Sequence, residues 1–472
     1  MTLSLRTFLD ELAADPAEGI CEIARPVDRD LEMCAVVKAL ERRGNPVIRF
    51  SDVVGTDIPT LFGTVATPER IARALGVDVL DCVEWFADRI RRPVPTRTVA
   101  DGPVQEVVWT GEEASLDRLP IGVHSPDDGG RYLTSGVLVV RDPATGSLNT
   151  GIYRLMVADP RHITVNVAPA HDAARIIGAA AARGESCDFA IVIGGHPTFP
   201  ISSQAKNPIA VDAYEVAGAL QGEPLEVVPG RTVDLPVPAQ AEIVVEGRIR
   251  ATERRPEGPF GEFTYYYGAA EAWVAEVEAI TMRPDPVYVD LHPAHVEHRC
   301  LWLFPGREAR LLEFLRQSVP SVHRVHLPLP GGSLSAVISL KDPRPGDARR
   351  VLLLALSVDV YVKQAVVVDD DIDVRDLEQV HWATTVRFQA DRDTIVVPNL
   401  RGVRTDPSAY TLAGPGTPNG PVSSGPHTTK MGLDATVPVG HPYGPRADLP
   451  PPGYEHLDLT DYLPADLPGS MR

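Results

Sequence analysis

Cysteine, aromatic residues and long apolar runs are all scarce in this sequence of 472 residues. The five cysteines are scattered and none stands in a CxxC spacing, which excludes a thiolate zinc cluster and a disulfide-stapled secreted fold. No run reaches the about 18 apolar residues of a membrane-spanning helix. Charges at Arg6, Asp10 and Glu11 interrupt any secretory leader. We therefore expect a cytoplasmic protein without a membrane span.

Basic residues are outnumbered by acidic ones. Lysine and arginine number 45 against 64 aspartates and glutamates, which gives a formal net charge of −19. This balance argues against general affinity for nucleic acid or an anionic membrane, because both need a basic face. The 44% of hydrophobic residues is ordinary for a globular protein, and the length suffices for more than one core.

The apolar pattern divides the chain into four parts, and the expected fold class is α/β, or α+β over several domains. Residues 1–105 are expected to form an N-terminal α/β domain, which opens with a helix capped by Ser4. Residues 106–300 are expected to form a strand-rich domain with a few helices, and residues 301–440 a second α/β domain. Residues 441–472 are rich in proline and are expected to form an extension.

Individual elements are predicted from periodicity. Helices are expected over residues 170–184, 307–319 and 347–358. Strands are expected over residues 163–167, 189–195, 242–251, 272–280, 335–341 and 364–368. In the fourth of these strands, apolar residues alternate with Glu276 and Glu278, which is typical of a half-buried antiparallel strand.

Residues 149–154 (NTGIYR) bring an amide, a glycine and an arginine close together. Arg154 leads into the apolar run LMV, and a buried arginine needs a carboxylate or phosphate partner. The residues alone favour the plainer alternative, a surface strand with an exposed arginine.

Residues 257–262 (EGPFGE) place two glutamates around Pro259 and two glycines. These residues exclude a regular helix and disfavour a central strand, so we expect a shaped loop that holds Glu257 and Glu262 near each other. Paired acids beside an arginine can keep one carboxyl protonated for general acid catalysis. A turn with two solvated glutamates is the alternative.

Two further candidates concern metal ions. His171 opens a helix, where a lone histidine is usually a cap or a surface residue, although Asn149 and His171 could share a divalent ion if the fold brings them together. The acidic run at residues 369–371, followed by Asp373, could attract a metal, but a solvated turn is the simpler interpretation.

Six segments together resemble the UbiD family of prenylated-FMN-dependent decarboxylases. They read NTGIYRLMV, AGALQGEP, EGPFGEF, VVDDDIDV, VVPNL and KMGLDATVP. The resemblance implies an N-terminal α/β domain, a central flavin-reductase-like split β-barrel that holds the cofactor, and a C-terminal α/β association domain. It also implies a homodimer or higher homo-oligomer, a small carboxylic acid as substrate, and a flavin prenyltransferase that supplies the cofactor.

The chemistry implied by the resemblance is non-oxidative, reversible decarboxylation of an aromatic or α,β-unsaturated acid. In the family scheme, the oxidised cofactor adds across the double bond of the substrate, CO2 leaves, and a protonated glutamate returns a proton. The proton donor maps to Glu262, while Arg154 orients the substrate carboxylate and pairs with Glu257. Such a donor needs a dry site to stay protonated at neutral pH.

The resemblance also implies contacts to the cofactor and a metal ion. The cofactor would contact Asn149, Thr150, Gly151, Ile152, Tyr153, Arg154, Ala170, His171 and Lys430, the last through its phosphate. Asn149 and His171 would bind a divalent ion, usually Mn2+, beside that phosphate, and binding of K+ stays open. The third metal ligand of the family is a glutamate, and its place is taken here by Ala213. Asp212 and Glu215 are close by, but neither is aligned to replace it.

Two other functions stay open. One is a tailoring decarboxylase of an aliphatic, polyketide-like unsaturated acid. The other is a non-catalytic flavin-binding paralogue, which only Ala213 favours.

Overall fold

The structure, a computed structural model, describes residues 2–15, 18–207, 210–409, 426–444, 447 and 462. By their contacts, residues 1–436 form one unit and residues 437–472 a second. The predicted extension, residues 441–472, lies almost entirely outside the described residues. The boundaries expected near residues 105 and 300 fall inside the first unit and stay predictions. In the described part of the chain, no helix has both the length and the apolar character needed to cross a membrane.

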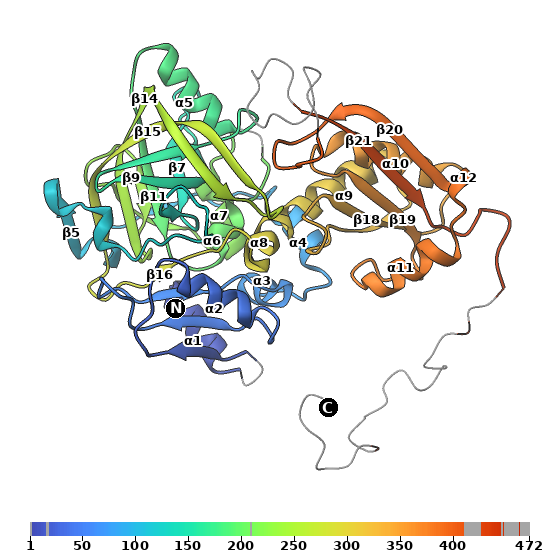
Figure 1. Cartoon of the computed structure of the whole chain (residues 1–472), viewed down its shortest axis with the longest axis horizontal. Helices are drawn as coiled ribbons and strands as arrows, with labels where there is room; N and C mark the ends of the chain where they lie inside the picture. The colour runs from blue at the N-terminus through green and yellow to red at the C-terminus, as the bar shows by residue number, and fades with distance from the viewer. Residues whose placement is uncertain are drawn as a thin grey trace. The chain divides into compact units, whose positions relative to one another are not determined.

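A four-stranded mixed sheet lies near the N-terminus, in the order β1-β2-β3-β16 (Figure 1). Its strands are β1 (Ile20–Ile23), β2 (Val47–Phe50), β3 (Thr60–Phe62) and β16 (Tyr288–Val289). The helices of this part are α1 (Leu5–Ala13), α2 (Glu32–Leu40), α3 (Pro68–Leu75) and α4 (Cys82–Arg89). Ser4 caps α1 as predicted: its side chain accepts the N–H of Thr7, whose side chain in turn accepts the N–H of Ser4.

The largest sheet has nine strands, and all its pairings are antiparallel. Its hydrogen-bonded path runs β6-β9-β10-β15-β14-β11-β7-β8, and β5 pairs with β15. The strands are β5 (Val107–Thr110), β6 (Tyr132–Leu133), β7 (Val137–Arg141), β8 (Leu148–Ile152), β9 (Arg154–Asp159), β10 (His162–Asn166), β11 (Cys187–Ile193), β14 (Ile243–Gly261) and β15 (Tyr267–Met282). Its accompanying helices are α5 (Asp172–Ala182), α6 (Thr198–Ser202) and α7 (Ala213–Gln221).

The path of this sheet is open, since no ladder among the described residues joins β6 to β8. The chain nevertheless links the two ends of the path. β8 ends at Ile152 and β9, the neighbour of β6, begins at Arg154, so the sheet curls back on itself around Tyr153. The mixed α/β class over several sheets is confirmed, while the split barrel stays a prediction.

The prediction of a loop over residues 257–262 is wrong for the first five residues, because Glu257–Gly261 continue β14, which pairs with β15. The register shifts between Glu257 and Phe260, so Gly258 and Pro259 form a bulge outside the ladder. A bulge accommodates proline, which cannot donate to a ladder. Gly258 has a φ of +99°, which favours glycine. The bulge thus removes the objection that Pro259 raised against a strand.

Two smaller sheets complete the first unit. A three-stranded sheet has the order β13-β12-β4 and a five-stranded mixed sheet the order β17-β18-β19-β21-β20. Their strands are β4 (Arg97–Thr98), β12 (Glu226–Pro229), β13 (Pro236–Pro238), β17 (Val322–His326), β18 (Ser335–Leu340), β19 (Gln364–Asp369), β20 (Thr394–Arg401) and β21 (His427–Asp434). The remaining α-helices are α8 (Val296–Leu303), α9 (Gly306–Ser318), α10 (Asp347–Val358), α11 (Leu377–Val386) and α12 (Ala390–Asp393), and short 3-10 turns are η1 (Pro103–Gln105), η2 (Gly111–Glu113) and η3 (Leu116–Arg118).

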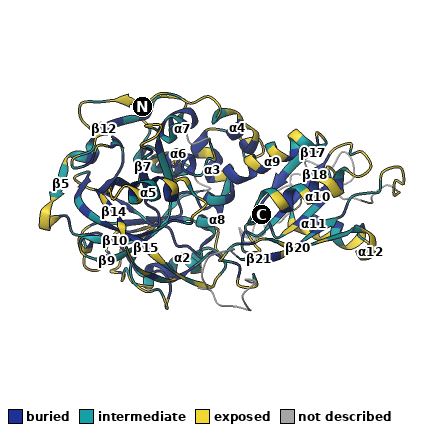
Figure 2. Ribbon diagram, turned by 90° about the horizontal axis from the view of Figure 1, so that it is seen from above, coloured by how far each residue is buried: buried dark blue, intermediate teal, exposed yellow. Residues whose placement is uncertain are grey.

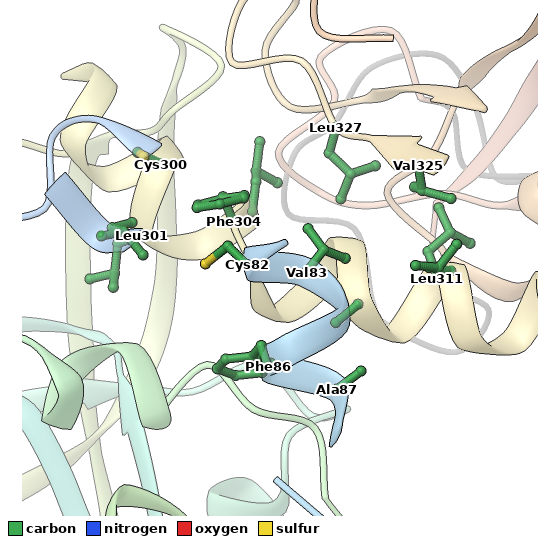
Figure 3. Packing of buried hydrophobic residues seen from close by; sticks show 14 of the residues in the cluster. Cys82, Val83, Phe86, Ala87, Cys300, Leu301, Phe304, Leu311, Val325 and Leu327 are labelled. Carbon is green, nitrogen blue, oxygen red and sulfur yellow. The ribbon is translucent and has the colours of Figure 1, made fainter. Parts of the chain in front are cut away.

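One apolar cluster joins the N-terminal helices to the C-terminal sheet. In it, Val83 and Phe86 of α4 lie near Phe304 and Leu311, which come from the end of α8 and from α9 (Figure 3). The cluster reaches β17 through Val325. Buried residues continue along the large sheet and the inner faces of its helices (Figure 2). The first and third predicted parts of the chain therefore share a core.

Most predicted elements are confirmed to within a few residues. The three predicted helices appear as α5, α9 and α10, and the six predicted strands as β10, β11, β14, β15, β18 and β19. In the acidic run, Asp369 ends β19, and residues 370–371 form the expected turn after it. Arg387 pairs with Asp369 and Asp371 there.

A buried carboxyl in α8 makes the stability of this core dependent on pH. Glu297 accepts the N–H groups of Gly63 and Val65 at 2.7 and 3.0 Å, and burial raises its pKa to about 7. The unfolded chain releases this proton near pH 4.5, the ordinary value, whereas the folded chain retains it to about pH 7. The free energy of unfolding should therefore fall by up to about 3 kcal/mol as the pH rises through this window.

We predict that Glu297→Gln flattens the decline of the melting temperature between pH 5 and pH 8, because the titrating group is removed. A constant loss of stability is also expected, since the amide offers only one acceptor oxygen. Thermal melts of the variant, the wild type and Glu271→Gln, an exposed carboxyl of β15, measure the slopes. Equal slopes for all three proteins would contradict the assignment.

Candidate active site

Arg154 lies between two glutamates that the sequence analysis singled out. Its Nη2 donates to Oε2 of Glu257 at 2.7 Å and its Nη1 to Oε1 of Glu262 at 2.5 Å. Glu257 is buried, and Arg154 and Glu262 retain side-chain exposures of 13% and 19%. The surface-strand alternative for Arg154 and the solvated-turn alternative for the glutamates are therefore wrong.

Strand register explains how these residues meet. Arg154 begins β9 and is the partner of Asn166 at the end of β10, while Tyr132 lies on β6, the other neighbour of β9. Glu257 comes from β14, directly before the bulge, and Glu262 directly follows the end of the strand. The bulge thus separates the two glutamates and lets both reach Arg154.

The two carboxylates have unequal surroundings. Glu257 accepts hydrogen bonds from three side chains: Arg154, the amide of Asn166 and, at 3.1 Å, the hydroxyl of Tyr132. Glu262 accepts one side-chain bond, from Arg154. Among the described residues, Glu257 therefore has three side-chain donors and Glu262 has one.

The surroundings of Glu262 raise the pKa of its carboxyl. Burial raises the pKa of its carboxyl, and the charge of Glu257 adds to the rise, although Arg154 acts in the other direction. A carboxyl with a raised pKa retains its proton more readily near neutral pH and can donate it. The arrangement therefore sets one guanidinium between a buried glutamate with three side-chain donors and a glutamate whose pKa is raised.

Aromatic rings gather beside Glu262. Phe263 lies 4.8 Å from Trp302 between ring centroids, Trp302 lies 4.8 Å from Tyr361, and His298 stacks on Trp302 at 6.2 Å. The charge of Glu262 acts on Tyr361, which places this cluster next to the carboxyl. The rings supply an apolar, polarisable surface at the candidate site.

Asn149 and His171 also lie in one region, because α5 packs against β8. His171 is the N-cap residue of α5, and its ring meets that of Tyr153 edge-on at 5.6 Å. Burial and the nearby Lys206 lower the pKa of His171 to about 4, so its imidazole is neutral at pH 7. Oδ1 of Asn149 is buried and has no hydrogen-bond partner among the described residues.

Comparison with known proteins identifies the family of this site. Profiles of 3-octaprenyl-4-hydroxybenzoate carboxy-lyase match in succession: the N-terminal domain over residues 17–90, the Rift-related domain over residues 97–295 and the C-terminal domain over residues 302–435. The chain belongs to the UbiD family. It is accordingly a carboxy-lyase, and the suspected resemblance is confirmed.

Several known proteins are similar to this chain over nearly their whole length. Anhydromevalonate phosphate decarboxylase of Methanothermobacter thermautotrophicus is 33% identical over 440 residues, which are 92% of this chain and 97% of the relative. The UbiD-class enzyme HmfF of Pelotomaculum thermopropionicum, solved with FMN, is 37% identical at a TM-score of 0.89, covering 98% of this chain and 100% of that chain. An evolved dimeric form of it was solved with prFMN, at 35% identity, a TM-score of 0.85 and the same coverage.

The name of a third solved relative refers to an aromatic acid. The apo 3,4-dihydroxybenzoic acid decarboxylase of Klebsiella pneumoniae is 25% identical at a TM-score of 0.85, covering 98% of this chain and 99% of that chain.

The metal site implied by the UbiD resemblance does not fit the residues present. No group of three or more His, Cys, Asp or Glu side chains in the described part of the chain could hold a metal ion. Asp212 caps α7, and its two oxygens accept the N–H of Tyr214 and that of Leu148, so its carboxylate points at these backbone groups. Glu215 stands two residues beyond Ala213 on α7, about 200° around the helix. Asn149 and His171 alone offer two neutral ligands and no carboxylate to balance the charge of a divalent ion.

The contacts of Lys430 differ from the contact to the cofactor phosphate that the UbiD resemblance implied. Its Nζ is buried in β21 and donates to the carbonyls of Leu356, Asp359 and Val360 at 2.9, 3.0 and 3.3 Å. These carbonyls lie at the C-terminal end of α10, where a cation is favourable. All three donors of the ammonium group are therefore used, and none is left for a phosphate.

Sequence reasoning missed the residues that support the glutamates. Tyr132 and Asn166 carry no motif, and only the strand register brings them to Glu257. Asp128 accepts the N–H of Gly261 at 2.7 Å and thereby fixes the residue before Glu262. No local sequence signal could have identified these contacts, because each joins segments more than 90 residues apart.

We predict that Lys430→Met destabilises the fold by about 3 kcal/mol, because carbonyls at the end of α10 lose a charged donor, while affinity for FMN stays unchanged. Chemical denaturation and a flavin titration measure the two effects, with the exposed Lys341→Met as control. A large loss of FMN affinity in a variant of normal stability would restore the phosphate role.

Proposed function

We propose that this chain is a prenylated-FMN-dependent, non-oxidative decarboxylase of an aromatic or α,β-unsaturated carboxylic acid, with Glu262 as proton donor. The observation that carries the proposal is the single guanidinium of Arg154 shared between two unequal carboxylates. Membership of the UbiD family, and a relative solved with prFMN, support the choice of cofactor.

Arg154 binds the substrate carboxylate in this proposal. Its guanidinium presents a planar fork that matches a carboxylate, and Glu262 holds one arm of that fork before the substrate arrives. Glu257, fixed by Asn166 and Tyr132, holds the other arm. A substrate carboxylate would therefore displace Glu262 from Arg154 and leave Glu257 in place.

Glu262 then acts as a carboxylic acid. Without its bond to Arg154, it loses the interaction that opposes the rise of its pKa, so proton uptake becomes more favourable. Prenylated FMN, when bound, supplies the electron sink that allows the bond between the substrate and its carboxylate to break. Glu262 gives its proton to the carbon atom that has lost CO2.

The ring cluster beside Glu262 favours an aromatic substrate. Phe263, Trp302 and Tyr361 can pack against a planar ring, and a relative of 25% identity is named as a decarboxylase of an aromatic acid. An aliphatic unsaturated acid is the second candidate, because a relative of 33% identity is named for anhydromevalonate phosphate. The non-catalytic alternative is disfavoured, since Arg154, Glu257 and Glu262 are all present and in contact.

The partners in this proposal are a flavin prenyltransferase, which makes the cofactor, and a second copy of the chain. A dimeric form of a UbiD-class relative supports the homo-oligomer.

The decisive experiment is a mass spectrum of the cofactor released from protein co-expressed with a flavin prenyltransferase, followed by a screen of unsaturated and aromatic acids for release of CO2. Prenylated FMN and turnover of at least one acid are expected. Bound cofactor without turnover of any acid would favour the non-catalytic paralogue.

We predict that Glu262→Gln lowers kcat by about 10²–10⁴-fold, because the amide cannot supply the proton, while KM changes little. The cofactor absorbance should be retained, and Glu271→Gln on β15 should behave as the wild type. Full activity in a cofactor-loaded Glu262→Gln protein would assign the donor role to another group.

The pH profile of kcat should follow the protonation of Glu262. The carboxyl donates only while protonated, so activity should be retained below its raised pKa and lost as the pH rises through it. Measurement of kcat from pH 5 to pH 9 in wild type and Glu262→Gln tests this sign. The idea fails if the alkaline decline persists unchanged in the variant.

A further inference from the structure

A tyrosine occupies a position in the turn after β14 that is usually taken by glycine. β14 ends at Gly261 and β15 begins at Tyr267. Between them, Glu262 donates its N–H to the carbonyl of Tyr266, and its own carbonyl accepts the N–H of Tyr265, both at 2.9 Å. This is the pattern of a three-residue hairpin loop whose last residue is left-handed and usually glycine. Tyr265 has a φ of +65°, and its β-carbon makes that conformation costly.

The side chain of Tyr265 makes contacts outside the hairpin that glycine could not make. Its hydroxyl accepts a hydrogen bond from Nη1 of Arg299 on α8 at 3.2 Å. Its ring centroid lies 5.5 Å from Nζ of Lys38 on α2 and 5.7 Å from the guanidinium carbon of Arg299. Cations at such distances are attracted to the face of an aromatic ring. Glycine would form the same turn without strain, so the strained tyrosine points to a role of its side chain.

The two cations that contact Tyr265 are themselves fixed. Nζ of Lys38 and Nη1 of Arg299 both donate to the carbonyl of Ala294, each at 3.1 Å. Nζ of Lys38 also donates to Oε2 of Glu41 at 2.7 Å, and Arg299 is buried. The tyrosine therefore binds an anchored surface of α2 and α8 rather than two freely moving side chains.

The other two residues of the loop also contact distant elements. Phe263 packs against Trp302 of α8, with 4.8 Å between the ring centroids. Oγ1 of Thr264 donates to the carbonyl of Thr405 at 2.8 Å. Of the three loop residues, Tyr265 alone has a positive φ. The turn that carries the candidate proton donor is thus fixed by side-chain contacts to other parts of the fold.

We propose that Tyr265 is a positioning residue, which ties the turn that carries Glu262 to α2 and α8. It keeps this carboxyl in place when the substrate displaces it from Arg154. The inference rests on the proposed function, in which Glu262 gives up its side-chain partner during each turnover. Its backbone must then hold the carboxyl toward the substrate, and a misplacement of about 1 Å can cost about 100-fold in rate. Arg154 lies outside this turn, so substrate binding should depend little on Tyr265.

The first test needs no substrate. Hydrogen exchange of the full-length protein, read by mass spectrometry, measures protection over residues 261–268, which include the bonded N–H groups of Glu262 and Tyr265. Tyr265→Gly should exchange these groups at least about tenfold faster than the wild type, because the turn loses its contacts to α2 and α8. Tyr265 is 59% exposed, so the fold should be retained. Unchanged protection would overturn the proposal.

Asp342→Gly is the matched control. Asp342 lies in an exposed loop after β18 and has a φ of +49°, so glycine relieves the same kind of strain away from the site. This variant should match the wild type in the protection of residues 261–268 and in turnover. Tyr265→Phe, which keeps the ring between the cations and loses only the hydrogen bond, should lie between Tyr265→Gly and the wild type. Equal loss of protection in Asp342→Gly would contradict the proposal.

The second test measures turnover, in protein loaded with prenylated FMN, of an acid that the wild type decarboxylates. Tyr265→Gly should lower kcat by about tenfold or more and change KM by less than about twofold. The alkaline decline of kcat should also move to lower pH, because a carboxyl that leaves its buried place loses the rise of its pKa. Partial unfolding would reduce the amount of active enzyme without moving this profile.

A wild-type kcat in Tyr265→Gly, or a lower kcat with an unchanged pH profile, would overturn the positioning role. The proposed function fails separately, if the loaded wild type turns over no acid. Hydrogen exchange then still decides whether Tyr265 holds the turn.

Discussion

The candidate active site depends on one guanidinium held between two carboxylates. Arg154 donates one N–H to Glu257 and one to Glu262, but Glu257 also has Asn166 and Tyr132 as donors. The asymmetry lies in the strands, which deliver two extra donors to one glutamate and none to the other. Glu257 and Glu262 thus differ in their number of hydrogen-bond donors and in their burial. Both factors influence the ionisation of a carboxyl.

A bulge in β14 of the large sheet gives the two glutamates their different surroundings. A regular β14 would alternate its side chains between two faces along the whole strand, and Gly258 and Pro259 interrupt this alternation beside the partner strand. Asp128 then fixes the backbone after the bulge by accepting the N–H of Gly261. Glu262 is consequently held by backbone anchoring on one side and by Arg154 on the other, so it can exchange its side-chain partner without disturbing β14.

The sequence predicted what depends on neighbours in the chain and failed where distant segments meet. The cap at Ser4 and the helix of residues 172–182 follow from capping and periodicity. The pairing of Arg154 with Glu257 joins segments 103 residues apart, and only the UbiD resemblance implied it. Tyr132 and Asn166 could not be predicted, because strand register alone gives them their role. Pro259 was misjudged for a related reason: whether a proline ends a strand or sits in a bulge depends on the partner strand.

The residue roles that the UbiD family implies therefore agree with the contacts of this chain at some positions and disagree at others. Arg154, Glu257 and Glu262 match the motif and are in contact, whereas Lys430 matches the motif and is consumed by the carbonyls at the end of α10. Its three bonds cannot be exchanged for a phosphate without exposing carbonyls to an apolar core. A match to the family motif therefore does not by itself assign Lys430 a contact to the cofactor.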